Sequence, residues 1–484
     1  MHRPARALFA LLCLLAPFAD AAGDLALTAC HVTDPSGVAG LDAECGTLTV
    51  PENPEAPEGA QVTLRVVRVP ALSGAAPESA FTVIQGGPGG SSVDLYLTLP
   101  GAFEGVRRDR DILLVDQRGT GGSDAMECAP GEFDPLLDLG TDPSLARRVA
   151  EECLAALSVD PRFYTTSLAV RDLDAVRAAL GYETLDLYGV SYGTRVALHY
   201  LRRYPDRVRT LVLDAVVPTG WILGPTVARD AQRTFDRLAA RCREDAACAE
   251  RFGDPARRLA ELLERVDAAP MIVEVRHPVS GTPERLALDR DRIALAIRML
   301  SYQGESAALL PLLVDRAADG DAAPLAAQVL IVADALGKSI AAGMHNAVVC
   351  SEDIPFADGE IDAEDTYLGA TTLAAMEAVC DIWPPGVVDP DLHEPFDAAV
   401  PALVLSGTED PITPPANGSA AARALPGSLE LVGEGQGHGI AFRGCLPRVI
   451  ADFVAAADTA ELDVSCVDDF APPPPFLSFS GPAP

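Results

Sequence analysis

The pentapeptide Gly189-Val190-Ser191-Tyr192-Gly193 restricts the fold of this 484-residue chain more than any other feature. It follows a short apolar, strand-like run at 185–188 and precedes a helix-like run at 194–204 that ends before Pro205. In a strand-turn-helix elbow of this kind the serine occupies a strained turn, and the two glycines let neighbouring backbone pass close to it. The sequence therefore predicts an exposed serine hydroxyl at the positive end of a helix.

Short apolar runs alternate with amphipathic stretches from Cys30 to about Val217, which is typical of an α/β layer structure. An amphipathic helical pattern covers 171–180 and ends at Gly181. The strand-like runs are bounded by Gly, Asp or Pro and comprise 81–84, 112–115, 185–188 and 211–213. This alternation predicts a mostly parallel sheet flanked by helices.

From about Pro218 to His393 the chain changes to long, alanine-rich helical stretches with one strand-like piece at 271–275. The strand pattern then resumes at 402–405 and 429–432 and is followed by a helix at 447–457. We therefore expect a helical cap inserted into an α/β core. The predicted organisation is a core of 22–217 and 396–469, a mainly helical cap of 218–395 and an irregular or extended proline-rich tail of 470–484.

The N-terminus predicts export. Arg3 and Arg6 precede an apolar run at 7–18, and Ala19-Asp20-Ala21 offers the small residues that signal peptidase reads, so residues 1–21 are interpreted as a signal peptide. Cys13 is not interpreted as a lipoprotein cysteine, because Leu12 is bulkier than the small residue that such a site needs before its cysteine. No later segment reaches about 18 uninterrupted apolar residues. We therefore expect a periplasmic or extracellular protein with no membrane association after cleavage.

Cysteine usage agrees with export. The mature chain has ten cysteines, which fall as neighbours along the sequence: Cys30 and Cys45, Cys128 and Cys153, Cys242 and Cys248, Cys350 and Cys380, Cys445 and Cys466. Five local disulfides fit this spacing, although ten cysteines permit many other connectivities. No C-x-x-C pair occurs and the seven histidines do not cluster, so no structural metal is expected.

The charge balance excludes some partners. The chain has 37 basic and 70 acidic residues, a net charge of −33. Such a surface repels phosphate backbones and anionic lipid headgroups, so nucleic acid is not an expected partner.

A serine nucleophile needs a base, and this kind of fold places the acid and then the histidine after the serine. Five histidines follow Ser191: His199, His277, His345, His393 and His438. The first lies in the helix after the elbow and the next three lie in the predicted cap. His438 lies in the glycine-rich loop 433–439, directly after a strand-like run, and is the predicted base. Asp410, which follows the strand-like run 403–405, is the predicted acid, with Glu409 as the alternative.

An acyl-transfer enzyme must also stabilise an oxyanion, usually with two backbone N–H groups. One should be the N–H of Tyr192. The other should come from the glycine-rich loop 85–92, where we select Gly87 because Pro88 has no N–H. A phosphate-binding role for this loop is not supported, since no G-x-x-x-x-G-K-[ST] motif occurs and the only lysine, Lys338, is remote. No cofactor is expected.

Five segments then identify a family resemblance. They are Gln85-Gly86-Gly87-Pro88-Gly89-Gly90-Ser91, Asp116-Gln117-Arg118-Gly119-Thr120-Gly121-Gly122-Ser123-Asp124, the elbow 189–193, Asp410-Pro411-Ile412-Thr413-Pro414 and Gly437-His438-Gly439. In this order they resemble the α/β-hydrolase peptidases of the prolyl iminopeptidase group, and in layout the secreted tripeptidyl aminopeptidases. The resemblance covers Cys30 to Cys466. Gln85 stands where the iminopeptidase pattern begins with histidine, which argues against a strict proline iminopeptidase.

The resemblance implies an α/β-hydrolase fold and a serine exopeptidase that removes short peptides from free N-termini through Ser191, His438 and Asp410. A carboxylesterase on the same fold is the alternative. A non-catalytic binding protein would have no physical need to keep this set of residues. Asp116 and Arg118 are interpreted as scaffold, in which an arginine and carboxylates join loops by an ion pair.

An aminopeptidase must also hold the substrate ammonium group at a fixed distance from the nucleophile. Glu352 and Asp353 in the cap are the predicted pair, because they follow Cys350 and precede the stiff apolar segment Ile354-Pro355-Phe356.

Overall fold

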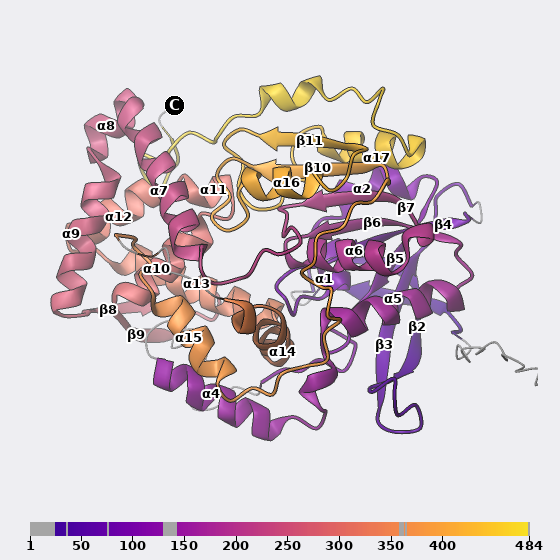
Figure 1. Cartoon of the computed structure of the whole chain (residues 1–484). Helices are drawn as coiled ribbons and strands as arrows, with labels where there is room; N and C mark the ends of the chain where they lie inside the picture. Colours follow the sequence, from indigo (N-terminus) through magenta and orange to yellow (C-terminus); the bar gives the residue numbers. More distant parts are fainter. Residues whose placement is uncertain are drawn as a thin grey trace, which may run out of the picture.

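The computed structural model describes residues 25–34, 37–74, 77–128, 143–357, 363 and 365–482. Its main feature is one sheet with the strand order β1-β2-β3-β5-β4-β6-β7-β10-β11 (Figure 1). The strands are β1 (Thr28–Thr33), β2 (Gly40–Pro51), β3 (Gln61–Val69), β4 (Ser79–Ile84), β5 (Asp111–Val115), β6 (Thr184–Val190), β7 (Val208–Asp214), β10 (Ala402–Gly407) and β11 (Ser428–Gly433). The predicted signal peptide, 1–21, lies outside the described residues.

From β5 to β11 every neighbouring pair of strands is parallel, whereas β1, β2, β3 and β5 pair antiparallel. The predicted mostly parallel sheet is therefore confirmed. The antiparallel strands β1 to β3 were not singled out from the sequence. In β3 the buried residues Val62, Leu64 and Val66 alternate with more exposed ones, so this strand lacks the continuous apolar run that identifies β4 and β5.

Helices cover both faces of the sheet. On one face α1 (Ser92–Thr98), α2 (Pro100–Arg107) and α17 (Leu446–Ala456) pack against a core that contains Phe81, Ile112 and Leu403. On the other face lie α5 (Thr166–Ala179), α6 (Tyr192–Arg203) and α16 (Pro415–Ala422), whose buried side chains share one core with Leu113 and Leu187. Helix α4 (Pro143–Ala156) lies apart from the sheet and packs against α15 (Thr371–Cys380) (Figure 1). Burial of both faces explains why β4, β5 and β10 are buried along their whole length.

The segment between β7 and β10 forms a cap with its own apolar core, gathered to one side of the sheet in Figure 1. Its elements are α7 (Val227–Glu244), α8 (Ala246–Phe252), α9 (Pro255–Ala268), β8 (Met271–Arg276), β9 (Pro283–Leu288), α10 (Arg290–Leu300), α11 (Gly304–Ala307), α12 (Leu310–Ala318), α13 (Ala323–Ser339), α14 (Ala342–Glu352) and α15 (Thr371–Cys380). The sequence predicted one strand here, and the structure has the hairpin β8-β9. The first half of β9 is exposed and carries no apolar pattern.

No single helix in the described ranges is long and apolar enough to cross a membrane. One bent pair, Ala323–Ser339 with Ala342–Phe356, reaches the required length and composition only when the two segments are taken together.

The described residues contain five disulfides, and each joins neighbours along the chain, as the spacing indicated. They are Cys30–Cys45, Cys128–Cys153, Cys242–Cys248, Cys350–Cys380 and Cys445–Cys466. The first joins β1 to β2, the third joins α7 to α8 and the fourth joins α14 to α15. The bonds therefore secure local substructures in both the core and the cap.

The tail after Phe470 is irregular, as predicted, but it packs against the folded protein (Figure 1). Phe470 packs against Gly433, and Pro472 packs against Gly435. Further on, Phe476 donates its N–H to the carbonyl of Ala308 at 2.9 Å. The Phe476 side chain packs on the cluster around Cys242 and Leu312 in the cap. The tail thus connects the C-terminal part of the core to the cap.

This packing predicts a difference between two phenylalanines of the tail. Phe476→Ala removes apolar contact with the cap and should lower Tm by roughly 2–5 °C. Phe479, whose side chain is 57% exposed, is the matched control, and Phe479→Ala should leave Tm unchanged. Thermal unfolding followed by circular dichroism measures both Tm values. Equal Tm shifts for the two variants would contradict a stabilising contact between the tail and the cap.

Candidate active site

Ser191 lies between the end of β6 and the start of α6, with φ 57° and ψ −127°. A positive φ is strained for a residue other than glycine. The turn is held by a hydrogen bond from the Ser191 N–H to the carbonyl of Asp214 at 2.9 Å. Side chains at the flanking glycines would collide with backbone, since a Cβ on Gly189 would lie 2.4 Å from the oxygen of Gly193, and one on Gly193 would lie 2.2 Å from the oxygen of Ile84. The elbow predicted from the sequence is present.

His438 and Asp410 form a hydrogen-bonded pair after the ends of β11 and β10. Nδ1 of His438 lies 2.8 Å from Oδ2 of Asp410, and Asp410 is fully buried. Burial favours the neutral acid, but His438 and the N–H groups of Ile412 and Thr413 hold the pKa of Asp410 below its usual value. The carboxylate therefore stays charged and fixes the imidazole, which leaves Nε2 available to accept a proton.

Ser191 and His438 line the same cavity, which has a volume of about 1000 Å³ and lies between the loops of the core and the cap. The loop of His438 is fastened to the cap at Tyr302. The N–H of His438 donates to the carbonyl of Tyr302 at 2.7 Å, and the two rings are in edge contact with centroids 4.8 Å apart. Ser191 and His438, which the sequence separates by more than half of the chain, thus face the same cavity.

Gly87 lines this cavity beside the predicted nucleophile. Its neighbour Gly86 packs so closely on Ser191 that a Cβ would lie 2.7 Å from the Cβ of Ser191. Gln85, the residue that departs from the iminopeptidase pattern, accepts a hydrogen bond from the N–H of Gly86 at 2.7 Å through its side-chain oxygen. Within the described residues the N–H of Gly87 donates no hydrogen bond. The N–H of Tyr192 belongs to the first turn of α6, where no intrahelical acceptor exists. Tyr192 follows Ser191 directly, and Gly87 follows Gly86, which packs on Ser191, so the use of both N–H groups as oxyanion donors stays a prediction.

Sequence reasoning missed two residues that hold the predicted acid and base. Oγ1 of Thr413 donates to Oδ2 of Asp410 at 2.7 Å and lies 3.2 Å from Nδ1 of His438. Asp214, at the end of β7, accepts hydrogen bonds from the N–H groups of Ile440 and Ala441, just after His438. Thr413 belongs to the Asp-Pro-Ile-Thr-Pro segment noted above. The turn after β10 directs its hydroxyl toward Asp410 and His438, and the sequence pattern does not reveal this direction.

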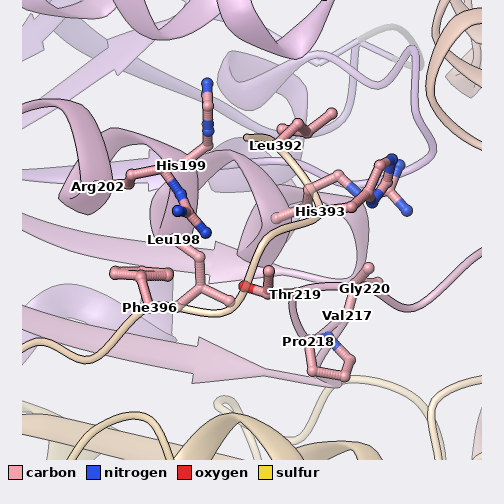
Figure 2. Close-up of a pocket in the computed structure, with 11 residues that line it drawn as sticks. Leu198, His199, Arg202, Val217, Pro218, Thr219, Gly220, Leu392, His393 and Phe396 are labelled. Atoms are coloured by element: carbon pink, nitrogen blue, oxygen red, sulfur yellow. The ribbon is translucent and has the colours of Figure 1, made fainter. Parts of the chain in front are cut away.

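Of the other histidines, His199 and His393 lie away from the cavity of Ser191, whereas His345 is part of its lining. His199 lies 3.0 Å from Asp389, and burial lowers the pKa of His199 to about 4. Figure 2 shows His199 and His393 at the edge of a small, separate pocket whose lining includes neither Ser191 nor His438. His345 contacts the carbonyl of Pro88, and burial lowers its pKa. No group of three His, Cys, Asp or Glu side chains in the described ranges could hold a metal ion.

Arg118 and Asp116 join loops, as interpreted from the sequence. Arg118 forms a bidentate ion pair with Asp172 at 2.6 and 2.7 Å, and its remaining donor binds the carbonyls of Glu52 and Phe163. Asp116 accepts hydrogen bonds from Ser91, Val93 and Gly122 instead of pairing with Arg118.

The prediction that Glu352 and Asp353 bind the substrate ammonium group is wrong. Both carboxylates are buried, at 0% and 1% exposure, and neither lines the cavity of Ser191. Asp353 pairs with Arg195 of α6 at 2.7 and 3.1 Å, and Glu352 accepts from the N–H and hydroxyl of Thr166, each at 2.7 Å. The acids lie at the C-terminal end of α14, which turns them toward the core and not toward the cavity.

The hydrogen bonds of Glu352 extend to the elbow of Ser191 through Thr166. The hydroxyl of Thr166 also bonds to the hydroxyl of Tyr192 at 2.7 Å, so the residue after Ser191 is anchored to Glu352. Two carboxylates share one guanidinium. Burial raises the pKa of Glu352 to about 7, although Arg195 and Thr166 lower it. Glu352 is therefore largely protonated at acidic pH, and Asp353 is the carboxylate that pairs with Arg195, at 2.7 Å.

The two acids should therefore respond differently to neutral substitution. The pKa of Glu352 is raised in the folded state, so its stabilisation is complete below the unfolded pKa of 4.5 and is lost as the pH rises through about 7. Glu352→Gln should match the unaltered protein at pH 5 and be more stable by roughly 3 kcal/mol at pH 8. Asp353→Asn should lose roughly 3 kcal/mol at pH 5, because Arg195 is left buried without a charged partner. Urea unfolding at both pH values tests this contrast, and an equal loss for both variants would refute it.

Comparison with known proteins agrees with this geometry. Residues 80–265 match the family model described as alpha/beta hydrolase fold, and residues 365–466 match the model described as TAP-like protein. Serine protease Hip1 of Mycobacterium tuberculosis is 27% identical over 481 residues, covering 91% of this chain and 90% of that protein.

Two further relatives carry different descriptions. Carboxylesterase B of Mycobacterium tuberculosis is 30% identical over 440 residues, covering 83% of this chain and 82% of that protein. Tripeptidyl aminopeptidase of Streptomyces coelicolor is 35% identical over 190 residues, covering 36% of this chain and 35% of that protein. The elbow, the sheet order and these matches together lead to one conclusion: the chain belongs to the α/β-hydrolase family, with a TAP-like C-terminal part.

Proposed function

We propose that this protein is an exported serine aminopeptidase that removes short peptides from free N-termini. The observation that carries the proposal is the pairing of His438 with buried Asp410 in a cavity that also contains Ser191 and Gly87. The N-terminal segment 1–21 and the five disulfides support export.

The proposed chemistry is acyl transfer in two steps. Oγ of Ser191 attacks the substrate carbonyl carbon while Nε2 of His438 takes the hydroxyl proton, and Asp410 stabilises the imidazolium that forms. The N–H groups of Gly87 and Tyr192 stabilise the oxyanion. When the tetrahedral intermediate collapses, His438 returns the proton to the leaving amine. Water then attacks the acyl-enzyme, again with His438 as base, and restores Ser191.

The cap supports an exopeptidase rather than an endopeptidase. The cavity lies under α10, α13 and α14, so a chain end can enter it more easily than the middle of a folded substrate. Its described lining contains two carboxylates, Glu127 and Asp334. Asp334 pairs with Lys338 at 2.9 Å. Glu127 is therefore our candidate for the ammonium group, in place of Glu352 and Asp353.

The experiment that tests the proposal compares tripeptide anilides with a free and with an acetylated N-terminus. An enzyme that binds the ammonium group should lose at least about tenfold in kcat/KM on acetylation, because a charge-assisted bond is removed. The carboxylesterase alternative, supported by the relative described as carboxylesterase B, predicts rapid hydrolysis of neutral esters and slow hydrolysis of both anilides. Equal rates on free and acetylated anilides would reject the aminopeptidase assignment.

Thr413 should act through Asp410 and His438 without touching substrate. Thr413→Val removes the hydroxyl bonded to the carboxylate, and kcat should fall about ten- to hundredfold with KM nearly unchanged. Thr413→Ser keeps the hydroxyl and is the matched control, expected to retain activity within about threefold. Steady-state kinetics of the two variants decide the point, and a kcat of Thr413→Val equal to that of Thr413→Ser would exclude the role.

A further inference from the structure

Arg298, on α10 of the cap, stands where two cavities meet. It lines the large cavity that contains Ser191 and His438, and it also lines a second cavity of about 240 Å³ under the cap. The two cavities share further lining residues, among them Leu295, His345 and Met376. A substrate group that extends from the nucleophile toward the second cavity therefore has to pass this guanidinium.

The charge of Arg298 is not balanced within the described part of the chain. Its Nη2 donates to the hydroxyl of Tyr302 at 3.1 Å, its Nε is buried without a partner, and it forms no ion pair with a described carboxylate. The other cation of the large cavity, Lys338, has Asp334 as its partner. A guanidinium without an ion pair keeps an unbalanced charge, and a carboxylate that enters the cavity would balance it through the accessible part of the side chain.

Arg298 is also held close to the predicted base. It lies one helical turn before Tyr302, and the ring of Tyr302 contacts the ring of His438 with centroids 4.8 Å apart. One tyrosine side chain thus separates the guanidinium from the imidazole. Cζ of Arg298 lies 5.8 Å from the centroid of the Tyr302 ring, so the guanidinium and the imidazole are at most about 11 Å apart. An extended peptide advances about 3.3–3.6 Å per residue, so a group that reaches Arg298 belongs to a residue about two or three positions from the scissile bond.

We propose that Arg298 binds a carboxylate of the substrate and gives the enzyme a preference for peptides that carry one two or three residues from the cleaved bond. The net charge of −33 repels anions from the molecule as a whole, so a local cation is needed to bind such a group. The carboxylate is either the free C-terminus of a short peptide or an acidic side chain. The inference rests on the proposed function only in taking Ser191 and His438 as the reacting pair.

Two matched pairs of peptides distinguish these sources. One pair differs in a C-terminal carboxylate or carboxamide, and the other in an internal Glu or Gln at the expected distance from the bond. The unaltered enzyme should prefer the carboxylate member of at least one pair by about tenfold or more in kcat/KM. Arg298→Gln should reduce this preference to within about twofold while kcat/KM for the neutral member stays within about threefold.

Two control variants separate binding from support of His438. Arg290→Gln removes the same charge from the same helix, but Arg290 pairs with Asp267 and lines neither cavity, so the preference should remain. Tyr302→Phe removes the hydroxyl that Arg298 holds and should also keep the preference. The proposal is overturned if the unaltered enzyme shows no preference for either pair, if Arg298→Gln lowers both members equally, or if Tyr302→Phe reproduces the effect of Arg298→Gln.

Binding to the inactive variant Ser191→Ala keeps this test apart from the proposed function. Calorimetry should give a Kd about tenfold lower for the carboxylate member of the preferred pair, and no difference in Ser191→Ala/Arg298→Gln. A carboxylate preference in binding without cleavage of free-amine peptides would reject the aminopeptidase and keep the Arg298 site. Cleavage of free-amine peptides without any carboxylate preference would reject the Arg298 site alone.

Discussion

The rest of the site depends on the contact between the start of α6 and the loop after β4. Gly193 approaches this loop so closely that a Cβ would lie 2.2 Å from the oxygen of Ile84, and Gly86 packs in the same way on Ser191. The strained nucleophile turn and the loop of Gly87 are therefore fixed against each other by backbone contact. The proposed oxyanion donors are backbone N–H groups of these two segments, so the packing fixes them before substrate binds, as effective oxyanion stabilisation requires.

The cap is fastened to the core through the same helix. Arg195 of α6 binds Asp353 at the end of α14 and the carbonyl of Trp221, where the chain enters the cap, while Glu352 binds Thr166 of α5. The acids of this junction are thus used to join the cap to the elbow. A second connection runs through Tyr302, whose carbonyl and ring hold His438. Both partners of the proposed proton transfer are therefore positioned by contacts between core and cap.

The features that could be predicted from the sequence are those encoded locally. The elbow around Ser191, the acid Asp410 after a strand and the base His438 in a glycine loop each follow a short pattern, and chain order relates them. The strands β1 to β3 and β9 were missed because partial exposure breaks up their apolar runs. The roles of Glu352 and Arg298 could not be predicted, because both are charged residues on cap helices. Only the packed structure turns one toward the core and the other toward the cavity.

The most direct test of the account is covalent labelling of the purified protein with a fluorophosphonate, followed by mass spectrometry of its peptides. A serine activated by His438 and Asp410 reacts with this probe, whereas an ordinary surface serine does not. The account predicts one label per molecule, on the peptide that contains Ser191, and loss of hydrolytic activity in proportion to labelling. A label on another serine, or full activity after Ser191 has been modified, would contradict it.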